Sequence, residues 1–297
     1  MWERRSSPKL AVSIARGLPL SLSIRSVVIA GLVAALPVRV SVAQRVPSAF
    51  PSYSYRQTPA SEPRSSRVWI VAGLHAAGWA LVYAAAQRTW GRSSGRFHVK
   101  NDWTGDSLSQ NDEASHLFFG YTLTRTFAGQ WRWGGMPPGR SRTVGAAESA
   151  LALTLVEVMD AFNPAQGLGI SDLVFDYTGV GAGLWTLGHP VDWTIRTSMK
   201  VRAHARVFAQ TEHQSDNYIW WVTYRPPLRW GLKQPLSLGV GHSVRREADG
   251  VTPVRELHFG IGTSLPDLVR TFAPHAARVL GILDFYYFNL NITATVR

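Results

Sequence analysis

The hydrophobic periodicity of this chain changes once, near Val191, and this change constrains the fold more than any other feature of the sequence. Before it, apolar residues recur at helical spacing. After it, apolar and polar residues mostly alternate with a period of two, which is typical of β-strands. We therefore predict an α+β protein in which an N-terminal bundle of about four apolar helices precedes a C-terminal antiparallel β-sheet.

The positions of glycine, proline and the apolar runs set the expected elements. The four helices are expected over residues 68–86, 111–128, 143–161 and 171–187, with a Trp-, Gly- and Pro-rich loop over 129–142. The strands are expected over residues 199–208, 218–224, 236–244, 254–263 and 285–296, with a turn at Asp249-Gly250 and a short helix within 266–280. The chain thus divides into a helical domain, 67–190, and a β region, 191–297.

The N-terminus has the pattern of a signal peptide over residues 1–43. Four basic residues from Arg4 to Arg16 precede an apolar stretch over 26–37, and small residues end at Ala43, before an expected cut at Gln44. The alternative is an uncleaved anchor, although the apolar stretch is short for a membrane span. Residues 44–66 are rich in Pro, Ser and Arg and are expected to form a disordered linker.

Charge and cysteine content narrow the function classes. Six of the 31 Lys and Arg residues and one of the 19 acidic residues fall within 1–43, which leaves 25 basic against 18 acidic residues and a net charge of +7. Because the basic residues are scattered, we expect membrane lipid as a partner and no nucleic acid. The chain has no cysteine, so disulfides and a cysteine-linked lipid anchor are excluded. We expect an exported protein of the periplasm or a membrane, either inner or outer.

The first helix of the mature chain is compatible with two environments. Residues 68–86 form a run of 19 residues without Asp, Glu, Lys or Arg, long enough to cross a hydrocarbon core. Their alanine and glycine content equally suits a helix buried in a bundle. His75 lies within this run, and we expect it to be a histidine with its hydrogen bonds satisfied inside the bundle rather than a ligand.

The other three helices each carry a polar pair at helical spacing. These candidate site residues are Asp112 with His116, Glu157 with Asp160, and Asp172 with Asp176. Side chains three or four residues apart lie on one face of a helix. The short connection between Ala161 and Ile170 places the third and fourth helices antiparallel, so that all three pairs are expected at one end of the bundle.

The ordered motifs that hold these pairs resemble the DUF2279 family, which includes YfiM-like envelope lipoproteins and is distantly similar to VanZ-like membrane proteins. The motifs are residues 112–116 (DEASH), 157–160 (EVMD) and 169–179 (GISDLVFDYTG), and the resemblance covers about residues 95–190. Glu113 stands where the family often has Lys, and Asp176 where it often has Asn, so both departures add negative charge. The resemblance implies an envelope protein and no particular activity.

Three interpretations of the polar residues remain open from sequence. In the structural one, Asp112 and Asp172 cap helices and the other polar residues form a network that fixes helix register. In the second, the cluster holds a divalent metal, with His116, Glu157, Asp160 and Asp172 as candidate ligands, and serves a hydrolase or transferase acting on a lipid or cell-wall precursor. The third is binding of another ligand or a partner. The strands could also belong to an outer-membrane barrel, although about five are too few to close one.

Overall fold

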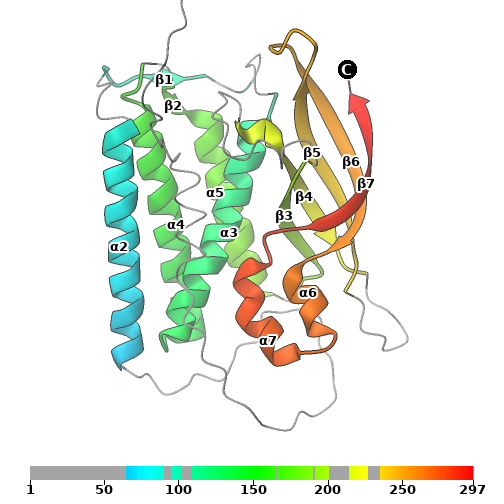
Figure 1. The fold of residues 1–297 in the computed structure, drawn as a ribbon. Helices are drawn as coiled ribbons and strands as arrows, with labels where there is room; N and C mark the ends of the chain where they lie inside the picture. Colours follow the sequence, from blue (N-terminus) through cyan, green and yellow to red (C-terminus); the bar gives the residue numbers. More distant parts are fainter. Residues whose placement is uncertain are drawn as a thin grey trace, which may run out of the picture.

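The computed structural model describes residues 65–89, 95–101, 103, 109–164, 166–189, 191–200, 214–226 and 235–296. The signal peptide and nearly all of the linker predicted above lie outside these residues. The chain is mixed helix and sheet, with the long helices first and a five-stranded antiparallel sheet after them (Figure 1). The long helices are α2 (Ser65–Thr89), α3 (Asn111–Trp133), α4 (Pro138–Asp160) and α5 (Ile170–Gly188).

The helix α3 packs between α4, α5 and the sheet, and small residues allow the close approach of its neighbours (Figure 1). A Cβ added at Gly120 of α3 would lie 2.4 Å from the backbone oxygen of Asp176, and one added at Gly179 of α5 would lie 2.3 Å from the backbone oxygen of Leu117. Only glycine allows backbones to approach this closely. The α3–α5 crossing therefore depends on these two positions.

The helix α2 lies on the outside of this group and is largely exposed. Among the described residues it is the one helix long and apolar enough to cross a membrane. Only 6% of its apolar stretch, Ser66–Ala84, is buried against the rest of the protein. A polar network joins it to its neighbours: Glu148 of α4 lies 2.6 Å from His75 Nδ1, and Gln130 of α3 lies 2.7 Å from His75 Nε2. As expected, His75 is satisfied inside the bundle.

The sheet has the strand order β3-β4-β5-β6-β7, and each pair of neighbours is antiparallel. Its strands are β3 (Trp193–Met199), β4 (Tyr218–Tyr224), β5 (Ser237–Arg246), β6 (Pro253–Thr263) and β7 (Phe288–Val296), with α6 (Leu265–Arg270) and α7 (Pro274–Val279) between the last two. The sheet curls so far that its first strand meets the segment before its last one. Thr197 of β3 forms an isolated parallel β-bridge with Tyr286, just before β7. A two-residue parallel pair, β1 (Val99–Lys100) with β2 (Leu168–Gly169), lies at the end of the bundle where α5 begins.

One face of the curled sheet encloses a buried charge network. Arg196 is 1% exposed and donates from Nη2 to the carboxylates of Asp267 and Asp284, both at 2.7 Å. Trp221 fills the space beside it, opposite glycines of β5 and β6. The other face meets α3, where Phe118 and Tyr121 share a core with Ile195 and Trp220. The helical and β parts of the chain therefore have a common core.

Several boundaries differ from the sequence prediction. Residues 129–142 are not one loop, since α3 continues to Trp133 and α4 begins at Pro138; proline is tolerated there because the first turn of a helix has no partner for its N–H groups. The first strand begins at Trp193 rather than Met199, and residues 201–208 lie outside the described part. "Four apolar helices" was too simple: the described residues form six α-helices, and α3 buries polar residues, including Asn111, along with apolar ones.

Candidate functional site

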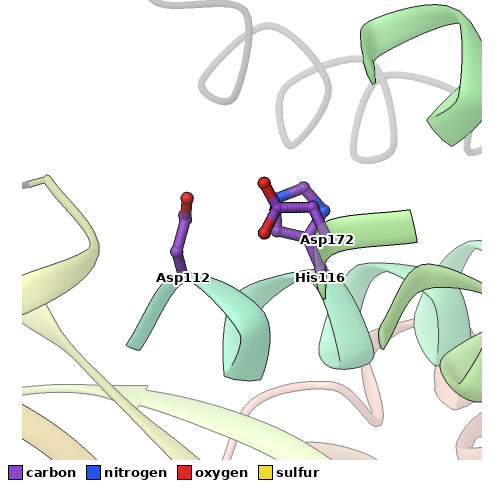
Figure 2. Close-up of side chains that lie close together, drawn as sticks. All are labelled: Asp112, His116 and Asp172. Atoms are coloured by element: carbon purple, nitrogen blue, oxygen red, sulfur yellow. The ribbon is translucent and has the colours of Figure 1, made fainter. Parts of the chain in front are cut away.

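Three segments bring polar side chains together at the end of the bundle where α3 and α5 begin and α4 ends. The α4–α5 connection is held by residues 95–100, where the His98 N–H donates to the Ala161 carbonyl at 3.0 Å and the Leu168 N–H donates to the His98 carbonyl at 3.1 Å. This tight connection sets Asp172, in the first turn of α5, beside the last turns of α4. Figure 2 shows Asp112 and His116 on α3, with Asp172 next to the imidazole.

His116 lies at the centre of these residues, and each of its ring nitrogens faces carboxylates. Nδ1 donates to Asp176 Oδ1 at 3.0 Å and lies 3.8 Å from Glu157 Oε1. Nε2 lies 3.6 Å from Asp172 Oδ1. Glu157 and Asp176 are fully buried, whereas Asp112 and Asp172 are half-buried. The imidazole therefore separates a buried inner side of the site from an outer side that reaches the surface.

The potential ligand atoms form two groups that share His116. The outer group is Asp112, His116 and Asp172, and the inner group is His116, Glu157 and Asp176; within each, the ligand atoms lie within 4.8 Å of one another. Five of the six residues predicted from sequence thus come together. Asp160, the last residue of α4, belongs to neither of these groups.

The side chains of the site are held from several directions. The Gly169 N–H donates to Glu157 Oε2 at 3.1 Å, and the Ser171 hydroxyl donates to Glu113 Oε1 at 3.4 Å. Glu113 is buried, and the sequence did not single it out as a site residue. The sequence did hold a clue to this position. Residues 113 and 116 of the first motif are three apart and therefore share a helix face. Glu113 therefore adds a further carboxyl close to the site.

The N-cap positions of α3 and α5 are not held by Asp112 and Asp172. The N-cap of α3 is Gln110, with a left-handed φ of 62°, and the N-cap of α5 is Gly169; neither makes a side-chain capping bond. Asp112 and Asp172 instead lie within the first turns of their helices, where the positive end of the helix dipole favours a negative charge. Both carboxylates therefore lie at the positive end of a helix, on the outer side of the site.

The charges of the site shift the pKa values of two of its members. Burial alone lowers the pKa of His116, but the hydrogen bond to Asp176 and the charges of Asp176, Asp172 and Asp112 outweigh it and raise the pKa from 6.5 to about 10. Burial raises the pKa of Glu157 from 4.5 to about 8, and the positive charge of His116 offsets only part of that rise. Without a metal, protons on His116 and Glu157 therefore balance part of the negative charge at neutral pH.

These shifts predict how stability depends on pH in protein kept free of metal with a chelator. Because the pKa of folded His116 is raised from 6.5 to about 10, its stabilising contribution is complete below pH 6.5 and is lost as the pH rises through 10. Glu157 acts in the same direction between pH 4.5 and 8, since the folded state retains its proton. Urea unfolding across this range should give a free energy of unfolding that falls with pH. The slope should be shallower in His116→Gln, and equal slopes would contradict the assignment.

The arrangement suits binding of a divalent cation better than nucleophilic catalysis. Histidine ligands of metals commonly donate their second ring N–H to a carboxylate, which fixes the tautomer and the ring orientation. Asp176 accepts this bond from Nδ1, so Nε2 is directed at the outer carboxylates. Glu157, with its raised pKa, can also accept or donate a proton near neutral pH.

Comparison of the chain with protein-family models, with curated proteins and with solved structures finds no match. The resemblance to DUF2279 rests on the three motifs, and it stays a prediction. The imidazole of His116 belongs to the first motif. Around it lie Glu157 of the second motif and Asp172 and Asp176 of the third.

Proposed function

We propose that the protein is an exported, membrane-associated protein of the cell envelope that binds a divalent metal ion between Asp112, His116 and Asp172. The observation that carries the metal site is the orientation of the imidazole. Its Nδ1 is bonded to buried Asp176, and its Nε2 faces Asp172 on the outer side. In this account Asp176 and Glu157 position the ligands, and the main role of the site is binding.

The spacing on the outer side supports a metal rather than a direct hydrogen bond. The 3.6 Å between His116 Nε2 and Asp172 Oδ1 is longer than a hydrogen bond. Two ligands on a tetrahedral ion with bonds of about 2.1 Å lie about 3.4 Å apart, so a small side-chain movement would complete the geometry. One imidazole with several carboxylates is a donor set suited to Zn²⁺ or Mn²⁺.

Membrane association rests on different residues. Large apolar side chains of α2, including Trp69, Leu81 and Tyr83, are exposed. The helix is the outermost of the four long helices (Figure 1). Arg67 lies 5.5 Å over the ring of Trp133, which places a basic and an aromatic residue together at the start of α2. Such pairs are favoured at the interface of an anionic membrane. Lipid is therefore the proposed partner, and nucleic acid is not.

The metal content of the purified protein tests the proposal. Wild-type protein dialysed against Zn²⁺ or Mn²⁺ should retain one ion per chain. His116→Ala should abolish retention, and Asp176→Asn should weaken affinity about 10- to 100-fold, because the residue that orients a metal ligand contributes that much. Plasma mass spectrometry of the dialysed protein, with circular dichroism as the check on folding, measures both.

Asp160→Asn is the matched control, since Asp160 belongs to the same sequence motif as Glu157 but to neither ligand group. This variant should bind the ion as the wild type does. If His116→Ala folds and still retains a stoichiometric ion, or if Asp160→Asn loses it, the proposed ligand set is wrong.

A second candidate is a metal-assisted hydrolase or transferase that acts on a lipid or cell-wall precursor. It is favoured by the half-buried state of Asp112 and Asp172, which leaves the outer side open to a water molecule or a substrate. The metal ion would then activate that water, while buried Glu157 stays on the inner side of the imidazole and does not touch the substrate. Metal-dependent release of phosphate from a lipid pyrophosphate by the wild type but not by His116→Ala would favour this function.

A further inference from the structure

The sheet presents an extended apolar surface on the face that α3 only partly covers. Eight large apolar residues of β4, β5, β6 and β7 on this face are each between 46% and 81% exposed. Strand register arranges them in two cross-strand rows, Val222-Val240-Phe259-Ile292 and Tyr224-Leu238-Ile261-Leu290. Single exposed apolar residues are common, but a contiguous surface of this kind marks a protein or membrane contact.

The opposite face of the sheet is enclosed and mixed in character. It buries the polar side chains of Arg196, Ser243 and His258 beside the aromatic rings of Trp221 and Tyr287. Large apolar side chains therefore point outward while charged and polar side chains are enclosed, which differs from a sheet whose outer face is in water and suits a sheet that faces lipid.

The charges on the apolar face are of one sign. Its only charged residues within the described strands β4 to β7 are Arg246 and Arg255, both near the turn that joins β5 to β6. Arg246 is mostly buried and ion-paired with Asp216 at 2.7 Å, whereas Arg255 is exposed and donates to the neutral side chain of Gln110. No Asp or Glu lies on this face of those strands. A surface of apolar rows with the exposed cation of Arg255 at one end is complementary to acyl chains beneath anionic headgroups.

We infer that this face of β4 to β7 rests on an anionic lipid bilayer, with its two apolar rows at the boundary between headgroups and acyl chains. The sheet lies on the membrane and does not cross it. The edge strand β7 would otherwise expose its outer backbone groups to hydrocarbon, where nothing can hydrogen-bond to them. The inference deepens the proposed membrane association, but it uses a surface separate from α2.

Because the chain has no cysteine, a single introduced cysteine can be spin-labelled without side reactions. Single-cysteine variants Leu290→Cys and Ile292→Cys carry a nitroxide on the apolar face, and Thr295→Cys carries one on the opposite face of the same strand. Power-saturation spectroscopy then compares the access of oxygen and of a nickel chelate to each label. It is done with and without vesicles of phosphatidylcholine containing phosphatidylglycerol.

Vesicles should raise the oxygen-to-nickel access ratio several-fold at residues 290 and 292 and leave residue 295 open to nickel. If the protein sediments with vesicles but residues 290 and 292 stay open to nickel, the sheet face is not the contact, while membrane association by α2 stands. If nothing sediments, both proposals fail. Labels shielded from oxygen and nickel before vesicles are added would mean that protein, such as a second copy, covers the face, and would overturn the inference.

Discussion

Arg196→Ala is expected to destabilise the fold by about 3–5 kcal/mol, because it removes the fully buried cation that joins Asp267 to Asp284. Arg225 and Arg270 remain beside Asp267. Arg125 lies 3.9 Å from Asp284, so the variant keeps part of the network. Arg196 is 1% exposed, and its Nη2 lies 2.7 Å from both Asp267 and Asp284. The network joins β3 to α6 and to the segment before β7. Urea unfolding followed by tryptophan fluorescence measures the loss, and failure to fold is its extreme form.

Arg245→Ala is the control for this prediction. The Arg245 side chain is 43% exposed, and its Nε lies 3.6 Å from Glu256. An exposed ion pair contributes at most about 1 kcal/mol, so the control variant should unfold almost as the wild type does. Equal and small losses in both variants would show that the buried network does not hold the sheet together.

Gly179→Ala should be the second most damaging change, with a cost of up to about 3 kcal/mol from overpacking. The added Cβ would lie 2.3 Å from the Leu117 backbone oxygen, so α3 and α5 would have to separate. That separation would also lengthen the bond between His116 and Asp176, which joins the same two helices. Thermal unfolding measures the first effect, and the ring-proton pKa of His116 by NMR measures the second.

Gly181→Ala, two residues along the same helix, should have the opposite sign. A Cβ added there meets no atom within 4 Å. Alanine favours a helix over glycine by up to about 1 kcal/mol, so this variant should be slightly more stable than the wild type. If Gly179→Ala behaves like Gly181→Ala, the close crossing of α3 and α5 is wrong.

The candidate site could be largely predicted from sequence because it depends on local spacing and on one short connection. Asp112 and His116 share a helix face, and the turn after Ala161 returns the chain so that α5 starts where α4 ends. These are properties of neighbours in sequence. Asp160 was predicted to join the site but belongs to neither ligand group. Residues three apart on a helix point about 60° from one another, and only packing decides which one turns inward.

The parts that sequence did not predict depend on contacts between distant residues. Arg196 lies before the first strand predicted from sequence, and its partners Asp267 and Asp284 are more than 70 residues away. Pro138 looked like a helix breaker until its place at the first position of α4 was known. The alternation in the strands gave the two faces of the sheet but not which of them would be enclosed, and the enclosed face holds Arg196 and Trp221 together.

The most direct test of the metal site is anomalous diffraction from crystals grown with Zn²⁺ or Mn²⁺, recorded on both sides of the absorption edge of the ion. We predict one strong peak on the outer side of the imidazole, about 2.0–2.1 Å from His116 Nε2 for Zn²⁺ and at bonding distance from carboxylate oxygens of Asp112 and Asp172. Asp176 should still accept the hydrogen bond from Nδ1. A fully occupied ion elsewhere, or crystals saturated with metal in which this position stays empty, would contradict the site.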